Sequence, residues 1–139
     1  MATRPRVTNA DYARLLRLRT RLRQFEHWSA EQAAAMGLTS SQHQLLLAIR
    51  GHGGHEGPTI GDVASYLLVR HNTAVELVNR TQELGLIERH RDGTDQRVVR
   101  LALTDEGSKR LNALSADHLE ELAQLATVVD ELFATLHTA

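Results

Sequence analysis

The chain has 139 residues, of which 42% are hydrophobic and 24% are charged, as expected for one globular domain with helical extensions. It contains no cysteine, which excludes disulfides, thiolate zinc sites and cysteine redox chemistry. The apolar run Leu45 to Ile49 is far too short for a membrane span, and Met1 to Arg6 lacks the apolar segment of a secretory signal. We therefore expect a cytoplasmic protein without membrane contact.

The net charge is only −1, but the charges are segregated along the chain. Residues 1–28 carry seven Arg against Asp11 and Glu26, a net +5, whereas residues 104–139 carry seven acids against Lys109 and Arg110, a net −5. We expect the two ends to pair. Only one of the sixteen basic residues is lysine, and arginine suits phosphate and guanine recognition, although a GC-rich codon bias explains the excess equally well.

Two helical segments are predicted before residue 38. Thr8 and Asp11 have the spacing of a capping box, and an amphipathic stripe follows at Tyr12, Leu15, Leu18, Leu22 and Phe25. Ser29 and Gln32 repeat the capping signal, and Gly37 has the place of a C-cap, which predicts a short second helix. We interpret residues 1–37 as an N-terminal dimerisation region.

Three further helices are predicted between residues 38 and 85. Thr39 and Gln42 cap the first, which ends near Gly51, and the glycine-rich residues 51–57 form a flexible connection. Thr59 and Asp62 cap the second, whose apolar face comprises Ile60, Val63, Ala64, Leu67 and Leu68. After a tight break at 69–71 the third runs to Leu84, before Gly85, and buries Ala74, Leu77, Val78 and Leu84.

A hairpin and a long helix complete the chain. Leu86–Arg91 and Arg97–Leu103 predict two strands around Asp92 and Gly93. From Thr104 onward a helical stripe contains Leu111, Leu114, His118, Leu122, Leu125, Val129, Leu132 and Leu136. A helix of this length, about 45 Å, needs the N-terminal helix or a second chain to cover its apolar face.

This order predicts a mainly α fold with a small β-hairpin wing (α+β): a winged helix-turn-helix at 38–103, between dimerisation helices in 1–37 and 104–139. In such a fold the helix after the tight turn enters the major groove of DNA. Its outward polar residues are Arg70, His71, Asn72, Thr73, Glu76 and Arg80. The hairpin adds Arg89, Arg91, Arg97 and Arg100, of which Arg97 is the leading candidate for the minor groove.

The chain resembles the multiple-antibiotic-resistance regulator (MarR) family over roughly residues 38–110. The resemblance rests on Leu38-Thr39, Val63-Ala64, the run from Leu84 to Arg89, Asp95-Gln96-Arg97, and the run from Leu103 to Gly107. It implies a homodimeric, DNA-binding transcriptional regulator. It further implies that the regulator is a ligand-responsive repressor acting on a pseudo-palindromic operator. It also implies that Asp95 orients Arg97 in the minor groove. Many members respond to small aromatic or phenolic compounds.

The chain departs from the family pattern at two positions of the helix expected to read DNA. Arg70 replaces the usual hydroxyl cap, so Asn72 is the alternative cap, and Glu76 either reads a cytosine amino group or repels phosphate. The same fold also serves as a protein-interaction module without DNA binding. A solvated helix face is the plain alternative for the polar residues listed above, and the hairpin favours DNA contact.

Other chemistry finds weaker support. Phe25 and Trp28 are candidates for an aromatic effector pocket, although aromatic residues at a helix end more often belong to a core or an interface. His52 and His55 have the spacing of metal ligands, but they lie in a glycine-rich loop that offers only one carboxylate, Glu56. We therefore expect neither a metal nor a cofactor. Residues of the catalytic-triad types, Ser40, Ser41, His43 and Asp62, form no assembled signature, and no enzyme is expected.

Overall fold

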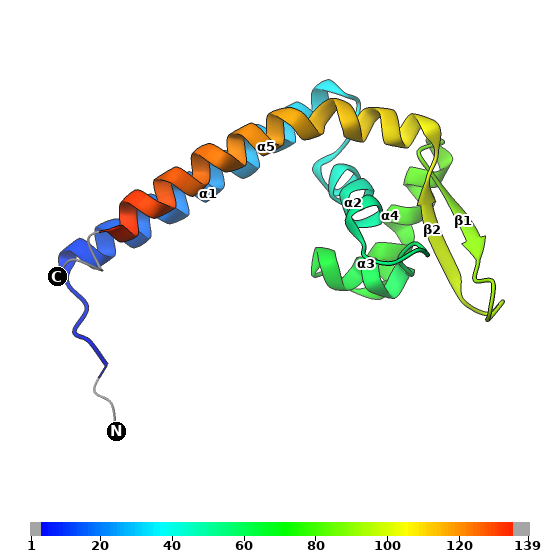
Figure 1. The fold of residues 1–139 in the computed structure, drawn as a ribbon, viewed down its shortest axis with the longest axis horizontal. Helices are drawn as coiled ribbons and strands as arrows, with labels where there is room; N and C mark the ends of the chain where they lie inside the picture. The colour runs from blue at the N-terminus through cyan, green and yellow to red at the C-terminus, as the bar shows by residue number, and fades with distance from the viewer. Residues whose placement is uncertain (1–3, 135–139) are drawn as a thin grey trace. The chain divides into compact units, whose positions relative to one another are not determined.

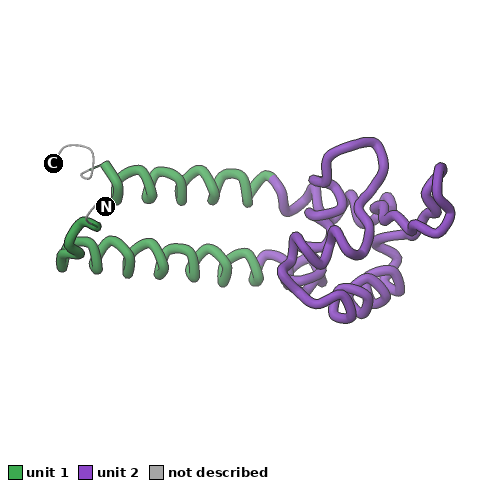
Figure 2. The backbone as a smooth tube through the Cα atoms, turned by 90° about the horizontal axis from the view of Figure 1, so that it is seen from below, with its two compact units in different colours: residues 1–31, 116–139 green, residues 32–115 purple. Residues whose placement is uncertain are grey.

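The computed structural model describes residues 4–134. They divide into two compact units (Figure 2). The first unit comprises the chain before residue 32 and after residue 115, and the second unit comprises residues 32–115. Among the described residues, no helix combines the length and the apolar character that a membrane crossing requires.

Five helices and one hairpin make up the described chain (Figure 1). In chain order they are α1 (Asn9–Ala35), α2 (Ser40–Gly51), α3 (Ile60–Leu67), α4 (His71–Glu83), β1 (Ile87–Arg91), β2 (Val99–Leu103) and α5 (Asp105–Ala134). The strands pair antiparallel, with Ile87 opposite Leu103 and Arg91 opposite Val99. The expected fold class, mainly helical with a small hairpin wing, is confirmed.

In the first unit, α1 and α5 run antiparallel and side by side (Figure 2). The Arg21 guanidinium donates to Glu121 at 2.8 Å, so one of the expected pairs between the basic and acidic ends forms. At the N-terminus of α1 the predicted capping box is present, because Thr8 N–H donates to Asp11 at 2.8 Å and Asp11 N–H donates to the Thr8 hydroxyl at 3.2 Å.

The predicted break before a short second helix is wrong, because α1 continues without interruption to Ala35. The Ser29 hydroxyl does not cap a new helix and instead lies 2.7 Å from Nε2 of His118 on α5. The chain leaves the helix only at Gly37, whose φ of +75° a residue with a side chain rarely adopts. The C-terminal region is likewise a single described helix, and Leu136 lies outside the described residues.

The second unit is built around a buried apolar cluster. Its fully buried members come from four helices, from β2 and from the residue before β1: Ala33, Leu45, Leu46, Val63, Ala74, Val78, Leu101 and Leu86. The predicted capping boxes of α2 (Thr39 with Gln42) and α3 (Thr59 with Asp62) are both present. These caps fix where each helix starts, so that the apolar stripes of α2, α3 and α4 meet in one core.

Two residues that were expected to be buried are exposed. Leu68 is 92% exposed and Leu84 is 52% exposed, because each lies just beyond the end of its helix, where the stripe no longer faces the core. The C-cap role of the following Gly85 is confirmed: its φ is +76°, and its N–H donates to Gln82 O at 2.9 Å.

Leu68 makes the tight turn that joins α3 to α4. It adopts a left-handed conformation (φ 56°, ψ 43°), and Val69 N–H then donates to Ala64 O at 3.1 Å. A side chain in this conformation costs about 1 kcal/mol relative to glycine. Since the Leu68 side chain is exposed, Leu68→Gly should raise the free energy of unfolding by about 1 kcal/mol in urea denaturation.

Leu68→Ala is the matched control for that substitution, because alanine removes the exposed side chain but keeps the left-handed strain. We expect it to leave the free energy of unfolding nearly unchanged. A glycine variant no more stable than the alanine variant would show that the turn stores no strain.

Candidate nucleic-acid interface

The α4 helix buries one face and exposes the other. Ala74, Val78 and Thr81 pack into the core, three or four residues apart. All six polar residues proposed from the sequence are exposed: Arg70, His71, Asn72, Thr73, Glu76 and Arg80. They follow the opposite stripe of the helix and its first turn. The helix therefore presents a polar surface that can reach base edges and phosphates. Glu76 is the one acid among these six residues.

The N-terminus of α4 has no side-chain cap. Arg70 occupies the N-cap position with extended backbone (φ −69°, ψ 154°), and its side chain makes no capping hydrogen bond. Asn72 lies inside the first turn, so its suggested role as the alternative cap is wrong. The backbone N–H groups of this turn, with the positive end of the helix dipole, are thus open to an anionic partner such as a phosphate.

On the hairpin, Asp95 and Arg97 form a local pair. The Arg97 Nε and Nη2 atoms donate to the two Asp95 oxygens at 3.2 and 3.4 Å, and Arg97 N–H donates to Oδ1 at 3.0 Å. These bonds lower the pKa of Asp95; the bond from the Arg97 side chain has the largest effect, and the bond from the Arg97 backbone comes next. The Arg97 side chain is 92% exposed. The pair thus holds a fully charged guanidinium out from the wing.

Asp92, which the sequence analysis treated only as a turn residue, organises the loop that carries this pair. Its Oδ2 accepts from the Thr94 hydroxyl at 2.9 Å and from Asp95 N–H at 3.1 Å. The pKa of Asp92 is lowered, mainly by a hydrogen bond between its carboxyl group and that of Glu56 and next by the bond from Thr94. The same contact raises the pKa of Glu56, so Glu56 takes up a proton before Asp92 as the pH falls.

Two other arginines of the hairpin, Arg89 and Arg91, form hydrogen bonds within the protein. Arg89 donates to Gln82 and, at 2.6 Å, to Asn79 Oδ1, both on α4. Arg91 donates to Gln96 O at 2.7 Å, across the hairpin loop. These two residues brace the wing and α4, and their proposed DNA contacts stay predictions. The Arg97 guanidinium, by contrast, bonds to the side chain of Asp95, two positions before it, and is 92% exposed.

Arg100 ties the wing to the glycine-rich segment before α3. Its Nη1 donates to Gly57 O at 3.2 Å, and its Nε lies 3.4 Å from Glu56 Oε2 and 3.6 Å from Asp92 Oδ1. Its side chain is 27% exposed, whereas that of Asp92 is 5% exposed. Sequence reasoning placed Arg100 among the basic residues of the hairpin and missed this internal role.

Arg100→Met keeps the length of the side chain and removes its charge, which leaves Gly57 O without its donor and the Glu56 and Asp92 carboxyl groups without a neighbouring cation. We expect the free energy of unfolding to fall by about 1 to 2 kcal/mol, measured by urea denaturation. In a Glu56→Gln background the loss should shrink, because one of the two acids is then absent. Equal losses in both backgrounds would contradict the link between Arg100 and Glu56.

The two candidates for an effector contact lie in the first unit. The rings of Phe25 and Trp28 are 6.1 Å apart between centroids, and Trp28 lies 4.7 Å from the His118 ring of α5. Both are partly buried in the packing of α1 against α5. An effector contact at Phe25 and Trp28 stays a prediction.

The histidines and the triad-type residues have other partners. Nδ1 of His52 lies 2.7 Å from the Tyr66 hydroxyl, and no cluster of three metal-binding side chains occurs within residues 4–134. The Ser40 hydroxyl accepts from Gln44 at 3.1 Å, and Asp62 caps α3.

A three-helix core, a tight turn before a polar helix, and a braced hairpin define a winged helix-turn-helix protein. Residues 36–98 match the family model described as "MarR family". Over this part of the chain, which is less than half of its length, the sequence is similar to the MarR family, in agreement with the motifs named in the sequence analysis.

Among curated proteins of Bacillus subtilis (strain 168), the HTH-type transcriptional regulator YsmB is 31% identical over 67 residues, which are 48% of this chain and 46% of YsmB. The HTH-type transcriptional repressor MdtR is 25% identical over 101 residues, 73% of this chain and 63% of MdtR. The chain thus spans about half to two thirds of the length of these relatives. Both are described as transcriptional regulators.

The fold is also similar to a solved structure of a Staphylococcus aureus protein, MepR, in complex with DNA. The TM-score is 0.68 at 20% identity, and the similarity covers 96% of each chain. This similarity extends over both units of the present chain and supports the fold alone.

Proposed function

We propose that this chain is a sequence-specific transcriptional regulator that binds double-stranded DNA as a homodimer. In this proposal it is a ligand-responsive repressor that acts on a pseudo-palindromic operator. The single observation that carries the proposal is the uncapped, polar face of α4 together with Arg97 on the wing of the same head. The repressor role follows the description of MdtR, and the DNA partner follows that of MepR. Such a regulator works in the cytoplasm, at the nucleoid.

In this proposal each part of the DNA-reading region, residues 38–103, has a separate role. The exposed residues of the first two turns of α4 read base edges in the major groove, and the open N-terminus of α4 receives a phosphate. Arg97 enters the neighbouring minor groove, where the potential is most negative. Asp95 positions Arg97, and Arg89 ties the wing to α4. Arg91 holds the hairpin loop, and Arg100 ties the wing to the segment before α3.

A homodimer is supported by apolar side chains that a single chain leaves uncovered on α1 and α5. The largest exposed fractions on these two helices are 61% for Tyr12, 53% for Leu15, 65% for Leu16, 68% for Leu119 and 44% for Leu122. Apolar surface concentrated on two long helices marks an interface, because water contact with it is unfavourable. We assign residues 1–37 and 104–139 to dimerisation and residues 38–103 to DNA reading.

Leu119→Asp places a charge in this interface and should shift the chain from dimer to monomer at micromolar concentration, measured by light scattering during size-exclusion chromatography. Leu47→Asp, on α2 of the other unit, is the matched control because Leu47 is 54% exposed. It should leave the dimer intact. A Leu119→Asp chain that stays dimeric would remove this face from the proposed interface.

The proposed function is tested by selecting bound duplexes from a random pool. We expect a pseudo-palindrome whose half-sites lie about one helical turn apart, and an affinity that falls steeply as salt rises. A winged helix that served only as a protein-interaction module would enrich no sequence and show no such salt dependence. That result would overturn the proposal.

A further inference from the structure

Leu68, in the turn between α3 and α4, combines two features that are each unfavourable to folding. Among residues 4–134 it is the only residue other than glycine with a positive φ, and it lies at φ 56° and ψ 43°. Its side chain is 92% exposed, the largest fraction of any large apolar side chain in the described part of the chain. The first feature strains the backbone, and the second leaves apolar surface in water.

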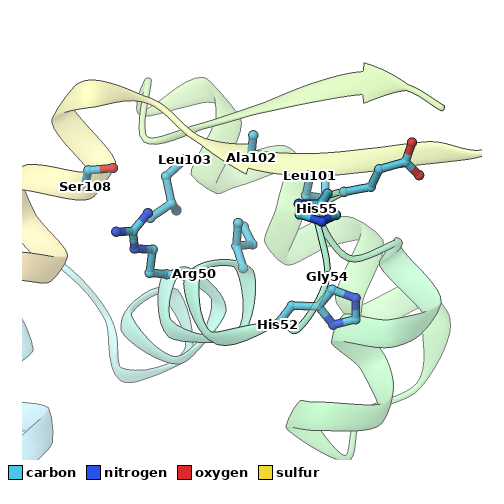
Figure 3. A pocket seen from close by; sticks show the side chains of 11 residues that line it. Arg50, His52, Gly54, His55, Leu101, Ala102, Leu103 and Ser108 are labelled. Carbon is cyan, nitrogen blue, oxygen red and sulfur yellow. The ribbon is translucent and has the colours of Figure 1, made fainter. Parts of the chain in front are cut away.

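The fold itself does not require a leucine at this position. The turn is closed by the main chain, since Val69 N–H donates to Ala64 O at 3.1 Å, and glycine adopts the left-handed conformation without strain. The hollow between the end of α2, the segment 51–57 and β2 does not take up the side chain either. Its lining consists of other residues, among them Arg50 and His52 (Figure 3).

Backbone strain of this kind is concentrated at functional sites, where a partner compensates for its cost. Since the Leu68 side chain contacts almost nothing within the chain, its partner is expected to lie outside the chain. An exposed leucine with relaxed backbone would need no such explanation. The combination of strain and exposure at one residue is therefore the observation that calls for a partner.

The place of Leu68 in the fold indicates which partner this is. Arg70, two residues further on, is the exposed N-cap of α4, the helix that is proposed to read the major groove. Two residues span at most about 7 Å, so Leu68 lies beside the first turn of that helix. The apolar group that base pairs present in the major groove is the C5-methyl group of thymine. An apolar side chain beside α4 therefore has a matching group on the DNA.

We propose that Leu68 is a specificity-determining residue, whose side chain packs against the methyl group of a thymine in the major groove, next to the bases that α4 reads. The proposal rests on the proposed function as a DNA-binding regulator and adds a preference to it. Hydrogen-bonding side chains of α4 cannot recognise a methyl group, whereas an apolar side chain can. Burial of one methyl group against apolar surface corresponds to roughly fourfold in affinity.

The proposal is tested with the full-length chain and the selected duplex, in which each thymine is replaced in turn by deoxyuridine in both half-sites. Uracil forms the same base pair and lacks the methyl group. We expect one thymine position at which the replacement weakens binding of the native chain by roughly tenfold, because one methyl contact is lost in each half-site. Fluorescence anisotropy measures the affinity for each duplex.

Leu68→Ala should bind the unmodified duplex roughly tenfold more weakly and should no longer distinguish uracil from thymine at that position. Leu68→Gly should lose the same discrimination although its free energy of unfolding rises. A substitution that acted only by damaging the fold would lower stability and affinity together. Leu84→Ala is the matched control, because Leu84 is 52% exposed at the opposite end of α4, and it should keep the native discrimination.

Three results would overturn the proposal. The same response to uracil in the native chain and in Leu68→Ala would show that Leu68 does not contact a thymine, while the proposed function would stand. Unchanged affinity of Leu68→Ala for the unmodified duplex would leave another protein as the partner of Leu68. A native chain that enriches no duplex at all would refute the proposed function and, with it, this role of Leu68.

Discussion

Arg97→Ala should weaken binding to every cognate duplex by about 1 to 3 kcal/mol, or roughly 5- to 150-fold. The Arg97 guanidinium is exposed and is oriented by two bonds to Asp95, so its removal costs a preorganised charge in the minor groove without disturbing the core. Arg97 is expected to respond to the width and the negative potential of the minor groove rather than to a base edge. The loss of affinity should therefore be nearly the same for all operators. Fluorescence anisotropy over a range of salt concentrations measures both the affinity and its salt dependence.

Arg19→Ala is the matched control, because this exposed arginine on α1 lies outside the DNA-reading unit. It should change the affinity much less than Arg97→Ala. Thermal unfolding of both variants should match that of the native chain, since neither side chain is buried. Equal DNA affinities for Arg97→Ala and the native chain would remove the wing from the interface.

Gly107→Ala should lower the free energy of unfolding by about 3 kcal/mol. A Cβ at this position would lie 2.0 Å from Leu86 O, well inside van der Waals contact. The carbonyl cannot move freely, because Leu86 O accepts from Thr104 N–H at 3.0 Å and Gly107 N–H donates to the Thr104 hydroxyl at 3.1 Å. The substitution therefore has to separate the start of α5 from β1, and urea denaturation measures the cost.

Gly51→Ala is the control, since a Cβ at the end of α2 would meet no atom within 4 Å. Alanine is also the better helix former, so the free energy of unfolding should stay within about 1 kcal/mol of the native value or rise. Similar losses for Gly51→Ala and Gly107→Ala would mean that the close approach to Leu86 is not what requires glycine.

Local patterns predicted the starts of α2 and α3 correctly, and the family resemblance implied the pairing of Asp95 with Arg97. The capping boxes at Thr39 and Thr59 depend on residues three apart, and the Asp95–Arg97 pair depends on residues two apart, so neighbouring sequence suffices. The same signal misled at Ser29, because a capping residue acts only where the chain enters a helix. Here α1 had already begun at Asn9, and the Ser29 hydroxyl found His118 on a distant segment.

Partners that are distant in sequence could not be predicted. Arg100 and Glu56 are separated by 44 positions, and only the folded chain brings them to 3.4 Å. The need for glycine at positions 57 and 107 likewise arises from backbone that comes from elsewhere in the fold. Leu68 and Leu84 were misassigned because a helical stripe gives the face of a residue but not where the helix ends.

The central claim is that α4 and the wing of each head contact the same half-site in different grooves. Since the chain has no cysteine, single substitutions Thr73→Cys, Gln96→Cys and Ala13→Cys can each carry one iron–EDTA group at an exposed position. On the selected duplex, we expect cleavage within each half-site from residue 73, cleavage flanking the half-sites from residue 96, and little from residue 13. Cleavage from residue 13 alone, or the same positions cut from residues 73 and 96, would contradict this arrangement.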